Sequence, residues 1–297
     1  MAMSKATLLN LTPDLHPGYR LSRLRGRGGF GEVWEAETTA GDIVALKFLR
    51  CTGNRSTTRE LRSIQLVQGL SHPHITQIKS VWCVGSYLMV AMELADGSLT
   101  DLLDIYLKEV GTPLPPDHLL PWLSQAAEAL DFLNNRQHRV HEQLVTVQHC
   151  DINPSNILLF GQTIKLSDFG LTSTLGARQQ VHQRAGTLAY AAPEVFQGSL
   201  SNRTDQYALA VCYCLLRGGC FPFTDTPEDF STDYTRPAPD LSMLTPAEQP
   251  IVARALTRMP QGRWASCGEL ISELQRVTPA PASAKPKPAT GTPRGTK

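Results

Sequence analysis

The sequence has no long run of apolar residues. Its longest apolar stretch, YALAVCYCLL at 207–216, is about half of the roughly 20 residues that a membrane-spanning helix needs. The N-terminal residues MAMSKATLLNLTPDLHPGY also have no apolar run long enough for a signal peptide. We therefore expect no membrane span and a cytoplasmic location.

Cysteines are present but lack the patterns that give them structural roles. The seven cysteines are odd in number and scattered, and no two have the CxxC spacing. This argues against a disulfide framework and against a zinc site of the usual spacing. We expect reduced thiols, in agreement with the cytoplasm.

Neither sign of charge dominates the chain, since 28 basic and 27 acidic residues leave a net charge of +1. A chain so balanced has no large field to steer it to nucleic acid or to a membrane surface, and no nucleic-acid partner is expected. The last stretch, PAPASAKPKPATGTPRGTK, has four basic residues, no acid and almost no large apolar side chain. This composition cannot bury a core, so it predicts a flexible tail over 278–297.

The 297 residues are enough for one or two cores. After an irregular lead-in over 1–18, strand-like runs with glycine breaks cover 19–50 and 74–94, with a helical pattern over 56–70 between them. From residue 95 the patterns are mostly helical. The sequence predicts an α+β chain with a small antiparallel sheet and one helix, followed by a larger, mainly α part.

GRGGFGEV, from Gly26 to Val33, fits the pattern GxGxxGxV. Glycines let backbone N–H groups approach phosphates that side chains would obstruct. A plain glycine-rich hairpin turn gives the same letters, so the pattern alone leaves both readings open. The stretch lies between two predicted strands, which disfavours a dinucleotide-binding fold, where it would join a strand to a helix.

Lys47 lies in the apolar, strand-like run VALK and is followed by Phe48. A lysine so placed needs a buried anionic partner, either phosphate oxygens or a carboxylate. Glu60, on the inner face of the following predicted helix, is a candidate carboxylate. Thr57 and Glu60 could instead form a capping box at the N-terminus of that helix.

Three further stretches follow in order: HCDINPSN at 149–156, SDFG at 167–170 and AAPE at 191–194. Together with the glycine pattern, Lys47 and Glu60, they resemble the signature set of protein kinases, over about Tyr19 to Val277. The resemblance implies the bilobal protein-kinase fold, with an N-lobe over about 19–94, a C-lobe over about 95–277, and ATP and Mg²⁺ as cofactors.

The resemblance also assigns roles to residues of the nucleotide site. Asp151 would accept or orient the proton of the acceptor hydroxyl, Lys47, Glu60 and Asn156 would complete the catalytic set, and Asn156 and Asp168 would ligate Mg²⁺. Met92 would be the gatekeeper of a hinge in which backbone groups of Glu93 and Ala95 meet adenine. The residues implied to bind ATP are Gly26, Arg27, Gly28, Gly29, Phe30, Gly31, Val33, Ala45, Lys47, Met92, Glu93 and Ala95.

Other implied roles concern the protein substrate and the scaffold of the site. Thr187 and Glu194 belong to the segment that meets the acceptor, and Thr187 together with Pro154 favours Ser/Thr over Tyr kinases. Asp205 would brace the backbone of the catalytic loop, and Arg263 would pair with Glu194. Without the resemblance, Asp205 and Arg263 could equally be a helix cap and a surface charge.

HCDINPSN departs from the family pattern HRDxKPxN at two positions. Cys150 replaces the Arg that receives the phosphate of a phosphorylated activation segment, and a thiol cannot pair with phosphate. We therefore expect little dependence on phosphorylation of Thr172, Ser173 or Thr174. Asn153 replaces a Lys that contacts the γ-phosphate, and losing one such donor typically costs on the order of 10²–10³ in rate.

The function that these residues predict is ATP-dependent transfer of phosphate to Ser or Thr of protein substrates, slowed by Asn153. The alternatives are a pseudokinase that acts as a nucleotide-binding or scaffolding module and, less favoured, phosphotransfer to a small molecule. The stretch NNRQHRVHEQLVTVQ at 134–148 is longer than the usual link into the catalytic loop. It predicts either a surface extension or a contact with a substrate or regulator.

Overall fold

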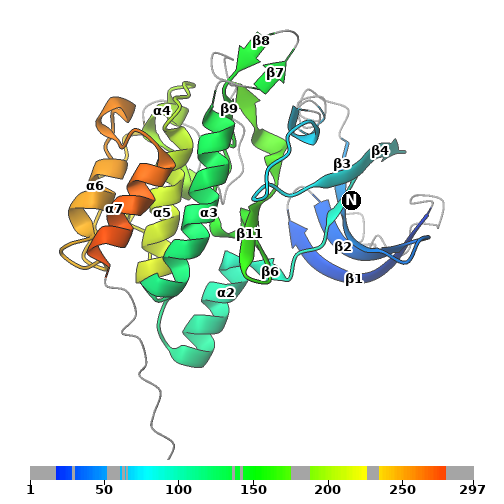
Figure 1. Cartoon of the computed structure of the whole chain (residues 1–297), viewed down its shortest axis with the longest axis horizontal. Coiled ribbons are helices and arrows are strands. Elements are labelled where there is room, and N and C mark those ends of the chain that lie inside the picture. The colour runs from blue at the N-terminus through cyan, green and yellow to red at the C-terminus, as the bar shows by residue number, and fades with distance from the viewer. Residues whose placement is uncertain are drawn as a thin grey trace, which may run out of the picture.

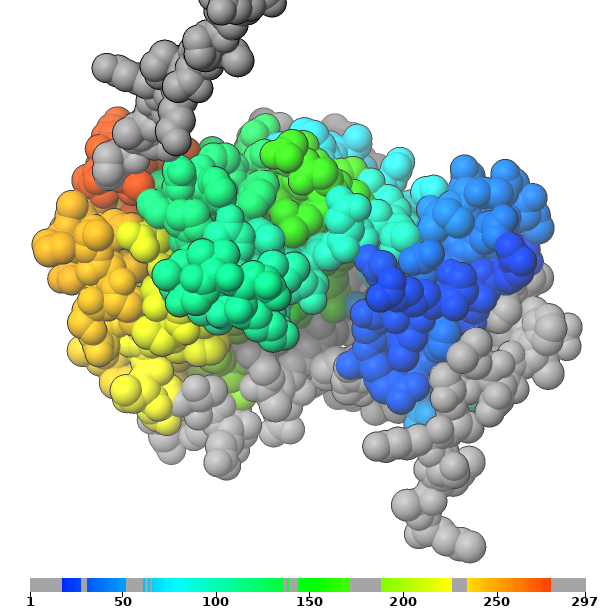
Figure 2. Space-filling model, turned by 90° about the horizontal axis from the view of Figure 1, so that it is seen from below, coloured from blue at the N-terminus to red at the C-terminus, as the bar shows by residue number. Residues whose placement is uncertain are grey.

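The structure is a computed structural model that describes residues 18–28, 31–51, 61, 64, 66–135, 138–140, 143–174, 188–225 and 234–278. Figure 1 shows a smaller part built on a β-sheet, joined through the segment before β6 to a larger part made mainly of helices. Figure 2 shows the two parts side by side, with the first strands in blue and the helical part from green to orange. This arrangement confirms the predicted α+β, two-lobed architecture.

Five antiparallel strands form the sheet of the smaller part, in the order β1-β2-β3-β5-β4. Side chains on successive residues of a strand point to opposite faces, and β3 accordingly serves two cores. Val44, Leu46 and Phe48 are buried on one face, and Leu49 is buried on the other with Ile64. The strands are β1 (Tyr19–Gly28), β2 (Gly31–Thr38), β3 (Ile43–Arg50), β4 (Ile78–Val84) and β5 (Tyr87–Glu93).

The helix predicted over 56–70 is described only in part. Leu61, Ile64 and residues 66–68 are helical, and Ile64 and Val67 are 5% and 2% exposed. Their apolar spacing therefore marks a face that packs inward, as the sequence predicted. Glu60 lies outside the described residues.

The larger part is organised around two long helices, α3 and α5. α5 is buried over nearly its whole length, which fits a helix that is apolar on all sides. α2 begins at Ser98, whose side chain accepts from the N–H of Asp101 while the Asp101 carboxylate accepts from the N–H of Ser98, a capping box. The helices are α2 (Leu99–Ile105), α3 (Pro116–Asn134), α4 (Pro193–Phe196), α5 (Thr204–Gly218), α6 (Gln249–Ala255) and α7 (Cys267–Val277), with a π-helix, η3, at Tyr106–Val110.

Short strands carry the segments between α3 and α4. β10 (Ile157–Phe160) pairs with β11 (Thr163–Leu166) and with β6 (Gly97–Ser98), and β9 (Val147–Gln148) pairs with β12 (Ser173–Thr174). The β10–β11 hairpin thus joins the stretch HCDINPSN to the stretch SDFG, so its register fixes where the two meet.

The long link at 134–148 contains a small hairpin, β7 (His138–Val140) and β8 (Gln143–Val145). His138 is 6% exposed, its Nε2 lies 2.8 Å from the carbonyl oxygen of Phe132, and the two rings meet edge to face. The predicted extension is therefore tied to the end of α3 through a buried histidine.

Three cysteines belong to the core of the helical part. Cys212 and Cys214 lie in α5, Cys267 opens α7, and all three are buried. Burial raises the pKa of Cys214 to about 12 and raises the pKa of Cys212 and of Cys267 well above the ordinary thiol value. These thiols are therefore protonated packing groups.

Within the described residues, no helix is long and apolar enough to cross a membrane.

The C-terminal end of α5 depends on close packing at Gly218. A Cβ at this position would lie 2.1 Å from Cγ and 2.8 Å from Cβ of Met243. Since the crowded atoms are close to the Met243 backbone, Gly218→Ala should lower the free energy of unfolding by about 1–3 kcal/mol in urea titrations. Gly69→Ala is the control, because its Cβ would meet only the Leu66 carbonyl oxygen at 4.0 Å. Equal stability of the two variants would contradict this packing.

Candidate active site

The glycine pattern forms the tip of the β1–β2 hairpin. Gly28 pairs with Gly31, Arg27 with Glu32 and Gly26 with Val33. At Gly31, φ is 158° and a Cβ would lie 1.7 Å from the carbonyl oxygen of Phe48, so only glycine fits there. Gly29 and Phe30, also predicted to contact nucleotide, lie outside the described residues.

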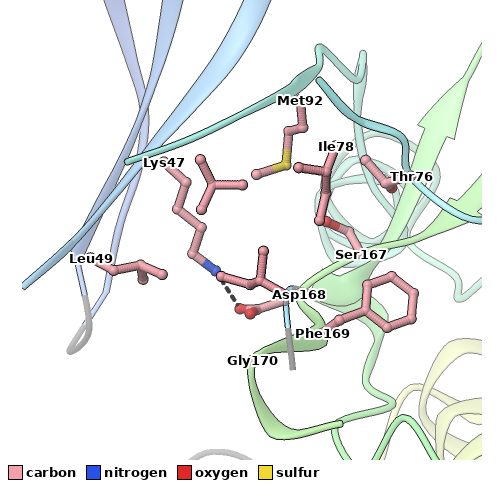
Figure 3. Close-up of a pocket in the computed structure, with 11 residues that line it drawn as sticks. Lys47, Leu49, Thr76, Ile78, Met92, Ser167, Asp168, Phe169 and Gly170 are labelled. Atoms are coloured by element: carbon pink, nitrogen blue, oxygen red, sulfur yellow. Dashed lines mark ion pairs between the residues drawn. The ribbon is translucent and has the colours of Figure 1, made fainter. Parts of the chain in front are cut away.

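Lys47 lies on β3, opposite Val33 of β2 and Val90 of β5. Its Nζ is 2.8 Å from Oδ2 of Asp168, and the two side chains are 18% and 25% exposed (Figure 3). The sequence suggested Glu60 as the carboxylate partner of Lys47, but Glu60 lies outside the described residues. The carboxylate that the structure places at Lys47 is that of Asp168, from a stretch more than a hundred residues later.

A small apolar cavity adjoins this ion pair. It has a volume of about 40 Å³ and extends from Lys47 to Phe169, between Ile64, Ile78 and Met92. Figure 3 shows the Met92 side chain beside Ile78, with its end directed toward the side of Lys47. The apolar side chains around it lower the local dielectric and so strengthen the attraction between Lys47 and Asp168. Ala45, the other residue of β3 predicted to bind ATP, is 6% exposed and lies opposite Met92 in the sheet.

The catalytic-loop stretch begins with a sharp turn held by Asp205, the second residue of α5. Its Oδ2 accepts from the N–H of His149 at 2.8 Å, and its Oδ1 accepts from the N–H of Cys150 at 2.9 Å. Cys150 has a φ of 65°, a left-handed conformation that is costly for a residue with a Cβ. Burial raises the pKa of Asp205, and the nearby His149 and the two N–H groups oppose that rise.

Asp151 follows directly and is 3% exposed. The Nδ2 of Asn153 lies 3.1 Å from the carbonyl oxygen and 3.3 Å from Oδ1 of Asp151, and the Nδ2 of Asn156 lies 2.8 Å from the same carbonyl oxygen. Asn153 Oδ1 accepts from the N–H of Ser155 at 3.1 Å and caps the short 3₁₀ helix η4, Pro154–Asn156. Asn153 is therefore fixed at both ends of its amide.

The SDFG stretch packs onto this loop. The Phe169 ring centroid is 4.5 Å from that of His149, and His149 Nε2 is 3.0 Å from the carbonyl oxygen of Ser167. The Ser167 N–H donates to the carbonyl oxygen of Asn156 at 2.9 Å. Asp168 has a φ of 60°, which turns its side chain toward Lys47. The structure thus brings Lys47, Asp168 and the loop that carries Asp151 and Asn156 into one constellation.

The predicted hinge contains contacts that the sequence did not reveal. Glu93 accepts from Lys165 Nζ at 2.6 Å and from the N–H of Gln77 at 2.7 Å. The carbonyl oxygens of Ala95 and Asp96 each accept from Arg25 Nη2 at 3.0 Å. Arg25 precedes the first glycine of the pattern, so it ties the glycine-rich hairpin to the hinge. No local signal could have singled it out among the arginines of β1.

Glu194 and Arg263 form a buried, bidentate ion pair. Arg263 is 1% exposed, its Nη1 is 2.8 Å from Glu194 Oε1, and its Nη2 is 2.7 Å from Oε2. Paired guanidinium and carboxylate groups in this geometry are strong and directional. Thr187, the other residue expected in the acceptor segment, lies outside the described residues.

A model of the family described as protein kinase domain matches residues 19–276. Serine/threonine-protein kinase PknH of Mycobacterium bovis is 33% identical over 266 residues, covering 85% of this chain and 42% of its own length. PknD and PknE of Mycobacterium tuberculosis are each 33% identical, over 274 and 265 residues, covering 85% of this chain and 38% and 44% of their own lengths.

The chain therefore spans less than half the length of these relatives. The family model nevertheless covers both lobes, from the first strand to the last helix. On these matches the chain belongs to the protein kinase family.

Proposed function

We propose that this chain is an ATP-dependent protein kinase that transfers the γ-phosphate of ATP to Ser or Thr hydroxyls of proteins. The observation that supports this most is the 2.8 Å ion pair of Lys47 with Asp168, next to the loop of Asp151 and Asn156. Phosphoryl transfer needs positioned charge more than covalent chemistry, and these groups supply it. Three relatives carry the name serine/threonine-protein kinase.

The donor set suits the cofactors that this family uses. A carboxylate at Asp168 and an amide oxygen at Asn156 are the hard oxygen ligands that Mg²⁺ prefers. The Asn156 amide already donates through Nδ2 to Asp151, so its Oδ1 is the atom suited to a cation. When bound, Mg²⁺ would neutralise charge on the phosphates. The cation of Lys47 would bind the α and β phosphates, and the glycines at 26, 28 and 31, which lack a Cβ, would let backbone N–H groups approach them.

Asp151 would take up the proton of the acceptor hydroxyl. Its backbone carbonyl is held by the amides of Asn153 and Asn156, and its carboxylate accepts a further hydrogen bond from Asn153. A neutral amide stabilises developing negative charge on the transferred group less than an ammonium would. Slow turnover with the base correctly oriented is therefore the expected consequence of Asn153.

A pseudokinase that acts as a scaffold is the second candidate, because Cys150 and Asn153 remove two positive charges from the loop. Against it stand the groups that retired kinases more often lose. Lys47, Asp168 and the glycine pattern all remain, and the first two are in contact. The two functions differ in whether Asp151 matters for transfer.

Asp151→Asn should lower the turnover number by at least about 10², because the hydroxyl loses its proton acceptor. Transfer of radiolabelled phosphate from ATP to protein substrate measures this, and nucleotide binding should persist. Asp104→Asn, on the exposed face of α2, is the matched control and should behave as wild type. The same low background for wild type and Asp151→Asn would favour the scaffold function.

Asn153→Lys should raise the turnover number. The gain should be about tenfold, below the 10²–10³ that one charged donor can supply, because lysine cannot accept from the Ser155 N–H and the cap of η4 is lost. Asn135→Lys adds the same charge at an exposed position after α3 and should leave the rate unchanged. A folded Asn153→Lys variant with an unchanged or lower rate would contradict the role given to this position.

Replacing Thr172, Ser173 and Thr174 together by alanine should preserve phosphoryl transfer. Cys150 offers no cation for a phosphate on these residues, so a phosphorylated form gains nothing at that position. Rates before and after phosphatase treatment of the wild type provide the companion measurement and should agree. Activity that disappears in the triple variant and depends on added phosphate in the wild type would overturn this expectation.

A further inference from the structure

Arg236 reaches the acceptor segment from a distant part of the chain. It lies between α5 and α6, and its Nη2 donates to the carbonyl oxygens of Leu188 at 2.7 Å and of Ala191 at 2.8 Å. These two carbonyls bracket the 3₁₀ helix η6, Leu188–Tyr190, whose three residues are all buried. Leu188 is the residue after Thr187, so Arg236 holds the backbone directly beside the predicted acceptor contact.

The guanidinium of Arg236 is held in place by aromatic rings. Its central carbon lies 4.6 Å from the centroid of the Phe223 ring. The rings of Phe196 in α4, Tyr207 in α5 and Tyr234 lie at 5.8, 6.0 and 5.7 Å. A cation among aromatic faces is attracted to them, most strongly where water is excluded. These four rings form an aromatic cage that holds the guanidinium in place. The guanidinium in turn holds the carbonyls of Leu188 and Ala191.

Two arginines thus hold the described acceptor segment at two places. Arg263 binds Glu194 in α4, and Arg236 binds the carbonyls of Leu188 and Ala191. The contact of Arg236 is the one nearer to Thr187, because Leu188 directly follows Thr187, where a protein substrate would be received. In the nucleotide site, Lys47 pairs instead with Asp168.

We propose that Arg236 is a positioning residue for the protein substrate: it sets the backbone of 188–191 and so the affinity for the acceptor polypeptide, without acting on nucleotide. This inference rests on the proposed kinase function. Hydrogen bonds from a charged donor are stronger than those between neutral groups, so their loss should lower the affinity for the acceptor polypeptide by about tenfold or more.

The structure also offers a way to restore the contacts of Arg236 after the residue is replaced by alanine. A cavity of about 330 Å³ lies against Arg236, between Pro193, Tyr207 and Leu256. It is large enough to admit a small organic cation. In Arg236→Ala, methylguanidinium can therefore enter through this cavity and occupy the vacated cage.

The test compares the wild-type chain of 297 residues with its Arg236→Ala variant and uses dephosphorylated casein as the protein substrate. The KM for casein should rise about tenfold, while the KM for ATP stays within about twofold of wild type. Methylguanidinium should bring the KM for casein back toward the wild-type value. Arg254→Ala is the matched control, because it removes another guanidinium that lies over an aromatic ring, 3.8 Å from that of Trp264, and that donates to the Gly262 carbonyl oxygen.

A second readout does not need activity. Hydrogen exchange at the Ala191 amide, which donates to the Leu188 carbonyl at 3.2 Å, should speed up in Arg236→Ala and slow again with methylguanidinium. Unchanged exchange and unchanged KM for casein, or KM values for casein and ATP that rise together, would overturn the proposal. If the wild type transfers no phosphate to casein while Arg236→Ala still speeds exchange at Ala191, the kinase function fails together with the role in substrate binding, and only the hold of Arg236 on the backbone of 188–191 remains.

Discussion

Two consecutive N–H groups, those of His149 and Cys150, donate to the single carboxylate of Asp205, and the position of Asp151 depends on those two bonds. Cys150 adopts a left-handed conformation that its side chain disfavours, and the carboxylate offsets that cost. This turn positions Asp151, and the side-chain amides of Asn153 and Asn156 donate to the backbone carbonyl oxygen of Asp151. If the carboxylate were removed, the N–H groups of His149 and Cys150 and the strained turn would be left without this support.

Asp205 is one of four consecutive residues that open α5, and each of the four binds a different part of the site. Thr204 donates to Glu194 at 3.0 Å, Gln206 binds the backbone of Trp264 and Ser266, and Tyr207 forms one wall of the Arg236 cage. All four are 4% exposed or less. A single helix turn thus holds both the loop of Asp151 and the segment of Glu194, so a shift of α5 would move both together.

The sequence predicted most of the architecture because apolar periodicity and glycine breaks are local signals. The strands around Lys47 and the burial of Ile64 and Val67 follow from side-chain spacing alone. The contacts of Arg25 and Arg236 could not be predicted, since each joins segments at least 45 residues apart and no pattern marks which arginine will reach across. The roles of Asp205 and Arg263 came from family resemblance, because a cap or a surface charge would have the same spacing. Lys47 needed an anion on physical grounds, but which carboxylate lies beside it required the fold.

The three buried thiols of the helical part give the molecule built-in probes of its own opening. Cys212, Cys214 and Cys267 are protonated and inaccessible while α5 and α7 stay packed, whereas Cys83 and Cys220 are exposed. An alkylating reagent attacks the thiolate, so the exposed pair should react at once and the buried three only when the helices part. The rate at which Cys212, Cys214 and Cys267 are alkylated would thus report how often α5 and α7 separate. No cysteine would have to be introduced for this measurement.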